Sequence, residues 1–250
     1  MGLDAEREWF TLWFNSPYYH ILYKYRDGAE ARRFLGNLKI ELNMRPPAQV
    51  LDVACGEGRF SRLLAEEGHL VKGIDIAEEN IQIAKKAACR KLSFFQHDMR
   101  KPFPFDPASF DFAFNFFTSF GYFESRAEHQ QTLENISAVL RVGGECLIDF
   151  MNVKKLKHSI RPVETKTIDG VTFKLKRSLS QGEVIKRIQV VAGQKPPLYF
   201  EERVKAFTLE DFEILLLGTP LEIIKTYGDY DLNPFQPERS DRLIIRAIKR

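Results

Sequence analysis

VLDVACGEGR, residues 50–59, is the stretch from which the fold of this chain can be predicted. Its first half is short, apolar and β-branched, and it follows two prolines, which is typical of a buried strand. Its second half contains Gly56 and Gly58, and residues 60–64 then bring apolar side chains at helical spacing. A strand, a glycine turn and a helix form the unit that cradles a nucleotide or a phosphate in doubly wound α/β folds.

The strand predicted next, residues 69–76, contains an acid near its end, Asp75. A carboxylate at that position can accept hydrogen bonds from both hydroxyls of a ribose. The dinucleotide-binding pattern G-x-G-x-x-G fails at its first and third places, where Ala54 and Arg59 stand. An arginine at the third place would block close packing of the helix on the strand. The sequence therefore argues against NAD as the ligand.

The spacing Asp52-x-Ala54-x-Gly56-x-Gly58 closely resembles motif I of the class I S-adenosylmethionine-dependent methyltransferases, which usually carry glycine where Ala54 stands. Three later stretches are similar to the same family. Residues 94–99 resemble its third strand with the following acid, 109–115 its fourth strand, and 140–148 a helix end and its fifth strand. Because the four motifs follow in the family's order, the chain is identified, by resemblance, as a member.

The resemblance implies S-adenosylmethionine as the cofactor. The turn would cradle the methionine part, Asp75 would bind the ribose, Ile76 and Met99 would flank the adenine, and Asp98 would accept from the adenine amino group. For Asp52, direct contact with the cofactor and bracing of the loop are equally compatible with the sequence. The residues expected at the cofactor are Tyr18, Tyr19, Asp52, Ala54, Cys55, Gly56, Gly58, Asp75, Ile76, Asp98, Met99, Asn115 and Phe116.

Strands and helices alternate along residues 46–151, which predicts a parallel sheet with right-handed crossovers. With the resemblance, this indicates a Rossmann-like, doubly wound, mostly parallel seven-stranded sheet that binds the cofactor. Residues 207–250 would complete it, with a last antiparallel strand at 242–248. Residues 152–206 lose the helical period and alternate between turn signals, which predicts an antiparallel β insert after strand five.

Residues 1–45 are rich in aromatic side chains and are expected to form a helical lid. A second amphipathic segment over residues 27–43 is expected to cover the sheet. Tyr18 and Tyr19 are expected at the cofactor, since a tyrosine offers an apolar face to a sulfonium and a hydroxyl to a carboxylate.

The net charge of +3 by itself indicates neither nucleic acid nor a membrane surface. The insert, however, carries 13 Lys and Arg against 5 Asp and Glu, a local charge of +8. Such a charge could bind RNA, but lysines also guard exposed strand edges, and no aromatic platform for bases accompanies them. An RNA methyltransferase and a non-catalytic S-adenosylmethionine-binding protein remain the alternatives to a small-molecule enzyme.

Three cysteines, Cys55, Cys89 and Cys146, have no metal-like spacing and indicate reduced thiols in a cytoplasmic protein. No apolar run approaches the roughly 18 residues that a membrane helix needs. We expect neither a metal ion nor a membrane as a partner. A free edge of the insert could pair with a second copy in a homodimer.

The acceptor follows less directly from the sequence. Residues 115–118 read Asn-Phe-Phe-Thr, without the prolines of the amino-group enzymes of this family, and no cysteine nucleophile follows. This favours transfer to an oxygen or nitrogen atom of a small molecule, with the insert roofing the acceptor pocket. His129 could act as a base, although a surface or capping role is the simpler expectation. Residues expected to face the acceptor are Tyr19, Phe120, Tyr122, Arg203, Tyr227 and Asp229.

Overall fold

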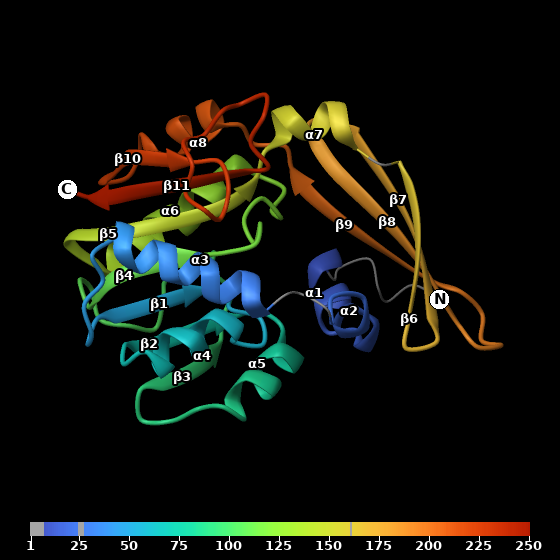
Figure 1. Cartoon of the computed structure of the whole chain (residues 1–250), viewed down its shortest axis with the longest axis horizontal. Coiled ribbons are helices and arrows are strands. Elements are labelled where there is room, and N and C mark those ends of the chain that lie inside the picture. The colour runs from blue at the N-terminus through green and yellow to red at the C-terminus, as the bar shows by residue number, and fades with distance from the viewer. Residues whose placement is uncertain (1–7, 25–27, 161) are drawn as a thin grey trace.

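The computed structural model describes residues 8–24, 28–160 and 162–250. A seven-stranded sheet has helices on both faces, and a four-stranded sheet stands apart from it, with the first two helices between the two sheets (Figure 1). The parts of the predicted lid at residues 1–7 and 25–27 lie outside the described residues.

The elements follow the alternation that the sequence predicts. In chain order they are α1 (Trp9–Phe14), α2 (Pro17–Leu22), α3 (Gly28–Glu41), β1 (Gln49–Val53), α4 (Arg59–Glu66), β2 (Leu70–Asp75), α5 (Glu78–Lys85), β3 (Leu92–Gln96), β4 (Phe110–Asn115), α6 (Arg126–Val139), β5 (Leu140–Met151), α7 (Val153–Ser159), β6 (Val163–Ile168), β7 (Val171–Ser180), β8 (Glu183–Ala192), β9 (Leu198–Lys205), α8 (Leu209–Leu216), β10 (Leu221–Tyr227) and β11 (Arg242–Lys249).

The large sheet has the strand order β10-β11-β5-β4-β1-β2-β3. The first five strands pair parallel, and β11 runs antiparallel between β5 and β10. The order in which strands are added to the sheet reverses at β1: β2 and β3 lie on one side of it, and β4 and β5 lie on the other. Doubly wound sheets bind their ligands at the carboxyl ends of the strands beside such a reversal. The predicted Rossmann-like, mostly parallel sheet is confirmed.

Both faces of this sheet are covered. Val50 packs in the cluster that includes side chains of α3, α4 and α5, whereas Leu51 and Val53 pack with α6 and α8. Because β1 is buried on both faces, it is apolar at successive positions, as parallel strands require. The exception is Asp52, a buried acid in the middle of an apolar strand.

The β insert forms an antiparallel sheet of four strands in the order β6-β7-β8-β9. Tight turns at Asp169-Gly170 and Gln181-Gly182 take positive φ angles, as the turn signals predict. The inner side of this sheet packs against α1 and α2, where Trp13 meets Phe173 and their neighbours. Two short helices were not predicted, α2 after Pro17 and α7 at the start of the insert.

Candidate active site

A cavity of about 570 Å³ lies at the carboxyl ends of the central strands, under α1 and α2. Among the described residues, the wall of this cavity includes none from the insert. Ten of the residues expected at the cofactor line the cavity: Tyr19, Asp52, Ala54, Cys55, Gly56, Asp75, Ile76, Asp98, Met99 and Phe116.

The turn after β1 takes its shape from residues in the left-handed region, with φ of +59° at Ala54, +57° at Gly56 and +74° at Gly58. Gly58 was expected at the cofactor but does not line the cavity. A Cβ on Gly58 would lie 2.5 Å from the ring of Phe94. Gly58 therefore permits close packing of the turn on β3, whereas Gly56 borders the cavity.

Asp75 joins this turn to the end of β2. Its Oδ2 accepts from the N–H of Gly56 at 2.8 Å, and its Oδ1 accepts from the N–H of Ala77 at 2.8 Å. Burial raises the pKa of the carboxyl above its ordinary value, although these hydrogen bonds oppose the change. Oδ2 retains a second lone pair for a ligand.

Asn80 borders the same part of the wall. Its Nδ2 donates to Asp75 Oδ1 at 3.4 Å, while its Oδ1 is buried and has no hydrogen-bond partner among the described residues. A buried acceptor without a partner is costly unless a ligand supplies a donor. Together with the remaining lone pair of Asp75 Oδ2, it fits the two hydroxyls of a ribose.

Asp52 lies in the cavity wall and is buried. Ser61, in the first turn of α4, donates to its Oδ2 at 2.5 Å. Burial raises the pKa of the Asp52 carboxyl to about 7, and the neighbouring charge of Asp75 contributes. The bond to Ser61 shows that Asp52 braces the turn, while its place in the wall leaves it within reach of a ligand.

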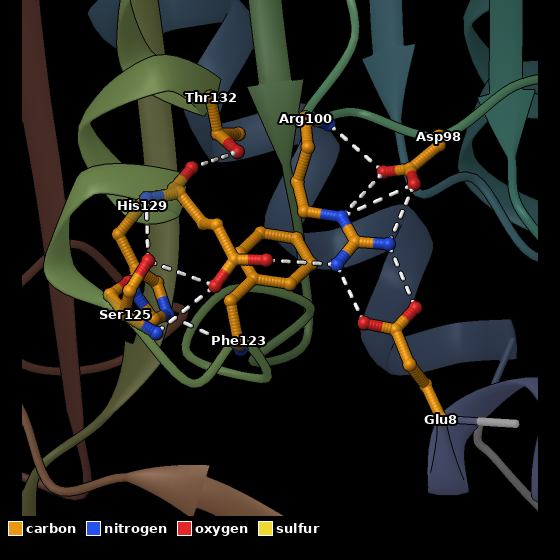
Figure 2. Close-up of polar contacts among 8 residues, drawn as sticks. Glu8, Asp98, Arg100, Phe123, Ser125, His129 and Thr132 are labelled. Carbon is orange, nitrogen blue, oxygen red and sulfur yellow. Dashed lines mark hydrogen bonds and ion pairs between the residues drawn. The ribbon is translucent and has the colours of Figure 1, made fainter. Parts of the chain in front are cut away.

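Asp98 follows β3 and is held by Arg100, whose guanidinium donates to both carboxylate oxygens at 2.7–3.1 Å (Figure 2). Arg100 also binds Glu8 and Glu128, so four charged side chains meet beside the cavity. Burial raises the pKa of Asp98, but the hydrogen bonds from Arg100 outweigh it and leave the pKa below its ordinary value. Sequence analysis did not identify Arg100.

The N-terminal helices supply the aromatic part of the wall. Phe10 and Phe14 of α1 and Tyr19 of α2 line the cavity, and His20 Nδ1 lies 2.5 Å from Glu57 Oε1 in the glycine turn. Tyr18, which was expected beside Tyr19, packs toward the insert and not into the cavity. Tyr19, one position later, lines the cavity instead, since adjacent helical positions face different sides.

The loop after β4 closes another side. Phe116, Phe117 and Ser119 line the cavity, and both Phe117 and Thr118 have a φ of +59°. Asp149, buried in β5, holds this loop by accepting from the N–H of Phe117 at 2.9 Å. Asn115 lies behind the wall, where its Nδ2 donates to the carbonyl of Val53 at 3.0 Å.

Tyr122 lines the cavity with its ring, and its hydroxyl donates to the carbonyl of Thr118 at 2.6 Å. Tyr19 is the other acceptor candidate in the described wall, whereas Phe120, Arg203, Tyr227 and Asp229 do not line the cavity. Arg203 is paired with Glu201 on the insert, and Phe120 is buried in the core.

Tyr227 and Asp229 are also placed differently from the prediction. Tyr227 is buried, with its hydroxyl 2.8 Å from Glu41 of α3. Asp229 accepts from the N–H groups of Asp231 and Asn233 and so shapes its own loop. The prediction assumed that every loop leaving the carboxyl edge faces the ligand, but this loop folds against α3.

His129 is buried, which excludes a surface position and leaves the expected capping role. Its Nε2 lies 3.4 Å from the N–H of Phe123 and accepts from it, which leaves Nδ1 to donate to the carbonyl of Ser125 at 2.8 Å (Figure 2). Burial lowers the pKa of His129 to about 4. Both ring nitrogens are engaged, so His129 holds the start of α6 and does not face the cavity.

Comparison with known proteins agrees with this architecture. Residues 50–144 match the model of a methyltransferase domain family. A Bacillus subtilis protein named as a methyltransferase, YqeM, is 26% identical over 219 residues, which cover 84% of this chain and 87% of the relative.

Two solved structures share the fold. A S-adenosylmethionine-dependent methyltransferase from Clostridium acetobutylicum has a TM-score of 0.77 at 17% identity, covering 92% of this chain and 95% of its own. CalS10, an amino pentose methyltransferase from Micromonospora echinaspora solved with S-adenosylmethionine, has a TM-score of 0.69 at 17% identity, covering 94% and 98%. Residues 50–144 thus match a methyltransferase domain, and the chain has the fold of S-adenosylmethionine-dependent methyltransferases.

Among the described residues, no helix combines the length and apolar character required to cross a membrane. No three of their His, Cys, Asp or Glu side chains form a group that could hold a metal ion.

Proposed function

We propose that this protein transfers the methyl group of S-adenosylmethionine to an oxygen or nitrogen atom of a small molecule. The observation that carries the proposal is the single cavity in which the glycine turn, the two strand-end acids and the aromatic lid residues meet. Its volume of about 570 Å³ falls in the range of small-molecule sites, which is roughly 300–1,000 Å³. Because the lid covers it, the cavity suits a small acceptor better than a polymer.

The residues of the wall suit the parts of the cofactor. Asp75 and Asn80 would hold the ribose, Ile76 and Met99 the adenine, and Asp98 the adenine amino group. The cofactor brings a methyl group that its positive sulfur activates, so the protein has to align and desolvate the reacting groups.

The methionine part and the methyl group would lie between the glycine turn and the aromatic side chains. Ala54 and Gly56 border the turn, and Tyr19 and Phe116 would flank the sulfonium. Aromatic faces attract cations, which suits a positive sulfur atom.

The pair of His20 and Glu57 gives the cavity a group that can move a proton. A carboxylate beside Nδ1 favours the tautomer that carries its proton on that atom and leaves Nε2 as a base. We propose that His20 accepts the proton of the acceptor. An amine acceptor would need this only if it binds protonated.

We propose that residues 1–45 act as a lid and that the insert braces it from behind. Glu202 of β9 accepts from Trp13 Nε1 at 2.7 Å and from the hydroxyl of Tyr23 at 2.5 Å, and it pairs with Lys186. The insert is thus joined to both lid helices while contributing nothing to the described wall. Glu202→Gln should therefore increase amide exchange of residues 17–22.

The RNA alternative receives no support from the insert. Many of its basic side chains are engaged with carboxylates, including Arg177 with Glu164, Arg187 with Glu201 and Lys205 with Glu183. Paired cations contribute less to phosphate binding than free ones, because the existing pairs must first be broken.

The experiment is to incubate the purified protein with S-adenosylmethionine and a panel of amino sugars, amines and phenols, and to measure S-adenosylhomocysteine. Amino sugars come first because CalS10 is an amino pentose methyltransferase. The expected result is release that depends on one class of acceptor and is lost in Asp75→Ala. Methyl incorporation into RNA, with none into the panel, would contradict the proposal.

A further inference from the structure

Arg100 stands where three carboxylates meet beside the cavity (Figure 2). Its guanidinium donates to both oxygens of Asp98 at 2.7–3.1 Å and to both oxygens of Glu8 at 2.5 and 2.7 Å. A further bond of 2.9 Å reaches Glu128. The guanidinium carbon also lies 4.9 Å from the ring centre of Phe123, within cation–π distance.

These partners come from three different elements. Asp98 follows β3, Glu8 immediately precedes α1, and Glu128 lies in the first turn of α6, where it closes the capping box with Ser125. One guanidinium thus joins the start of the lid to the acid in the cavity wall. The helix that begins beside Glu8 carries Phe10, which lines the same cavity.

The bonds of Arg100 differ in exposure. The side chains of Arg100 and Asp98 are 19% and 13% exposed, whereas that of Glu8 is 42% exposed. Water competes for an exposed ion pair and weakens it, while a shielded two-bonded pair keeps its geometry. The ion pair with Asp98 is therefore the more stable of the two, and the ion pair with Glu8 is the one that can open and close.

We propose that Arg100 is a positioning residue for the adenine of the cofactor, orienting the carboxylate of Asp98 and latching α1 over the same end of the cavity through Glu8. This rests on the proposed function, in which Asp98 accepts from the adenine amino group. Orientation by Arg100 determines how strongly the site distinguishes an amino group from a carbonyl, and the Glu8 contact determines how readily the lid opens.

The orienting role and the latch role of Arg100 predict different behaviour for substitutions at Arg100 and at Glu8. Arg100→Gln should lower the preference for S-adenosylhomocysteine over S-inosylhomocysteine, which carries a carbonyl in place of the amino group, by about tenfold. Arg100→Lys keeps the charge but loses the planar fork, so it should lose part of the preference. Glu8→Gln leaves Asp98 held by Arg100 and should keep the preference.

The experiment is calorimetric titration of both homocysteine compounds into the parent and the variants, with hydrogen exchange of residues 9–14 measured without ligand. Arg250→Gln is the control, because it breaks an exposed pair with Glu222 away from the cavity. We expect faster exchange of residues 9–14 in Glu8→Gln and Arg100→Gln, and parent behaviour in the control.

The outcomes separate this inference from the proposed function. If the parent protein binds neither compound, the proposed function itself is wrong. If the parent binds S-adenosylhomocysteine, an undiminished preference in Arg100→Gln would overturn the orienting role. Tighter binding in that variant would also overturn it, because Arg100 would then compete with adenine for Asp98. Unchanged exchange in Glu8→Gln, a surface variant that should fold normally, would overturn the latch.

Discussion

The backbone N–H of Gly56 donates to Oδ2 of Asp75 over 2.8 Å, which ties the turn after β1 to the end of β2. The other oxygen is held by the N–H of Ala77. The carboxylate is therefore fixed by the protein, and it shapes the turn while keeping a lone pair for a ligand. The turn after β1 and the end of β2, which this bond joins across 19 positions, therefore form one structural unit.

Asp75→Ala should weaken binding of S-adenosylhomocysteine by roughly 1.5–3 kcal/mol, the contribution of hydrogen bonds to a charged acceptor. Calorimetric titration measures it. Asp229→Ala is the matched control, since Asp229 also accepts from backbone N–H groups but lies outside the cavity wall. A variant that binds as tightly as the parent would show that another residue holds the ribose.

Gly73→Ala should lower the free energy of unfolding by about 1–3 kcal/mol, the usual cost of overpacking a core. A Cβ at Gly73 would lie 2.7 Å from the ring of Phe94 and 2.8 Å from Sγ of Cys55. Gly36→Ala, in α3, meets nothing within 4 Å and should raise the free energy of unfolding by about 0.5–1 kcal/mol. Urea unfolding compares the two, and equal effects would refute the packing argument.

Asp149→Asn should lower the free energy of unfolding by about 3 kcal/mol, because it leaves the charge of Arg242 with no paired carboxylate in the core. The hydroxyl of Tyr230 also donates to Asp149, at 3.0 Å. Glu222→Gln, which breaks an exposed pair with Arg250, should leave the free energy of unfolding nearly unchanged. Denaturant unfolding measures the free energy of unfolding of both variants. A small effect of Asp149→Asn would mean that the buried contacts of Asp149 with Arg242 and Tyr230 contribute little to stability.

His129 makes stability depend on pH. Its pKa is about 4 in the folded protein and about 6.5 when unfolded, so the unfolded chain binds more protons between these values. This contribution is complete above about pH 6.5 and is lost as the pH falls toward 4, roughly 3 kcal/mol in all.

The comparison with His129→Gln isolates that contribution. The parent should lose more free energy of unfolding than the variant between pH 7 and pH 4. Asp52, whose raised pKa gives the opposite slope, is present in both proteins and cancels. Parallel curves for the two proteins would show that His129 is not a buried neutral group.

The fold and the cofactor-facing part of the site could be predicted because their signals are local. A glycine turn after an apolar strand, and acids after the next two strands, need only sequence order to be placed at one sheet edge. The same reasoning identified Tyr19 but also gave Tyr18, since spacing alone does not show which face of a short helix turns inward.

The rest of the site depends on contacts between distant residues. Arg100 meets Glu8 across 92 positions, and Asp149 meets Arg242 across 93. No periodicity or motif joins such pairs. For Arg203 the sequence leaves both a place at the pocket and a pair with an acid open, and in the structure Glu201, two residues away, binds its guanidinium.

The most direct test of the central claim is calorimetric titration of the purified protein with S-adenosylmethionine, S-adenosylhomocysteine and NAD. The account predicts saturable binding of both sulfur compounds at one site and no heat with NAD, because Arg59 stands where a dinucleotide site needs a glycine. Binding of NAD, with no heat from either sulfur compound, would contradict it.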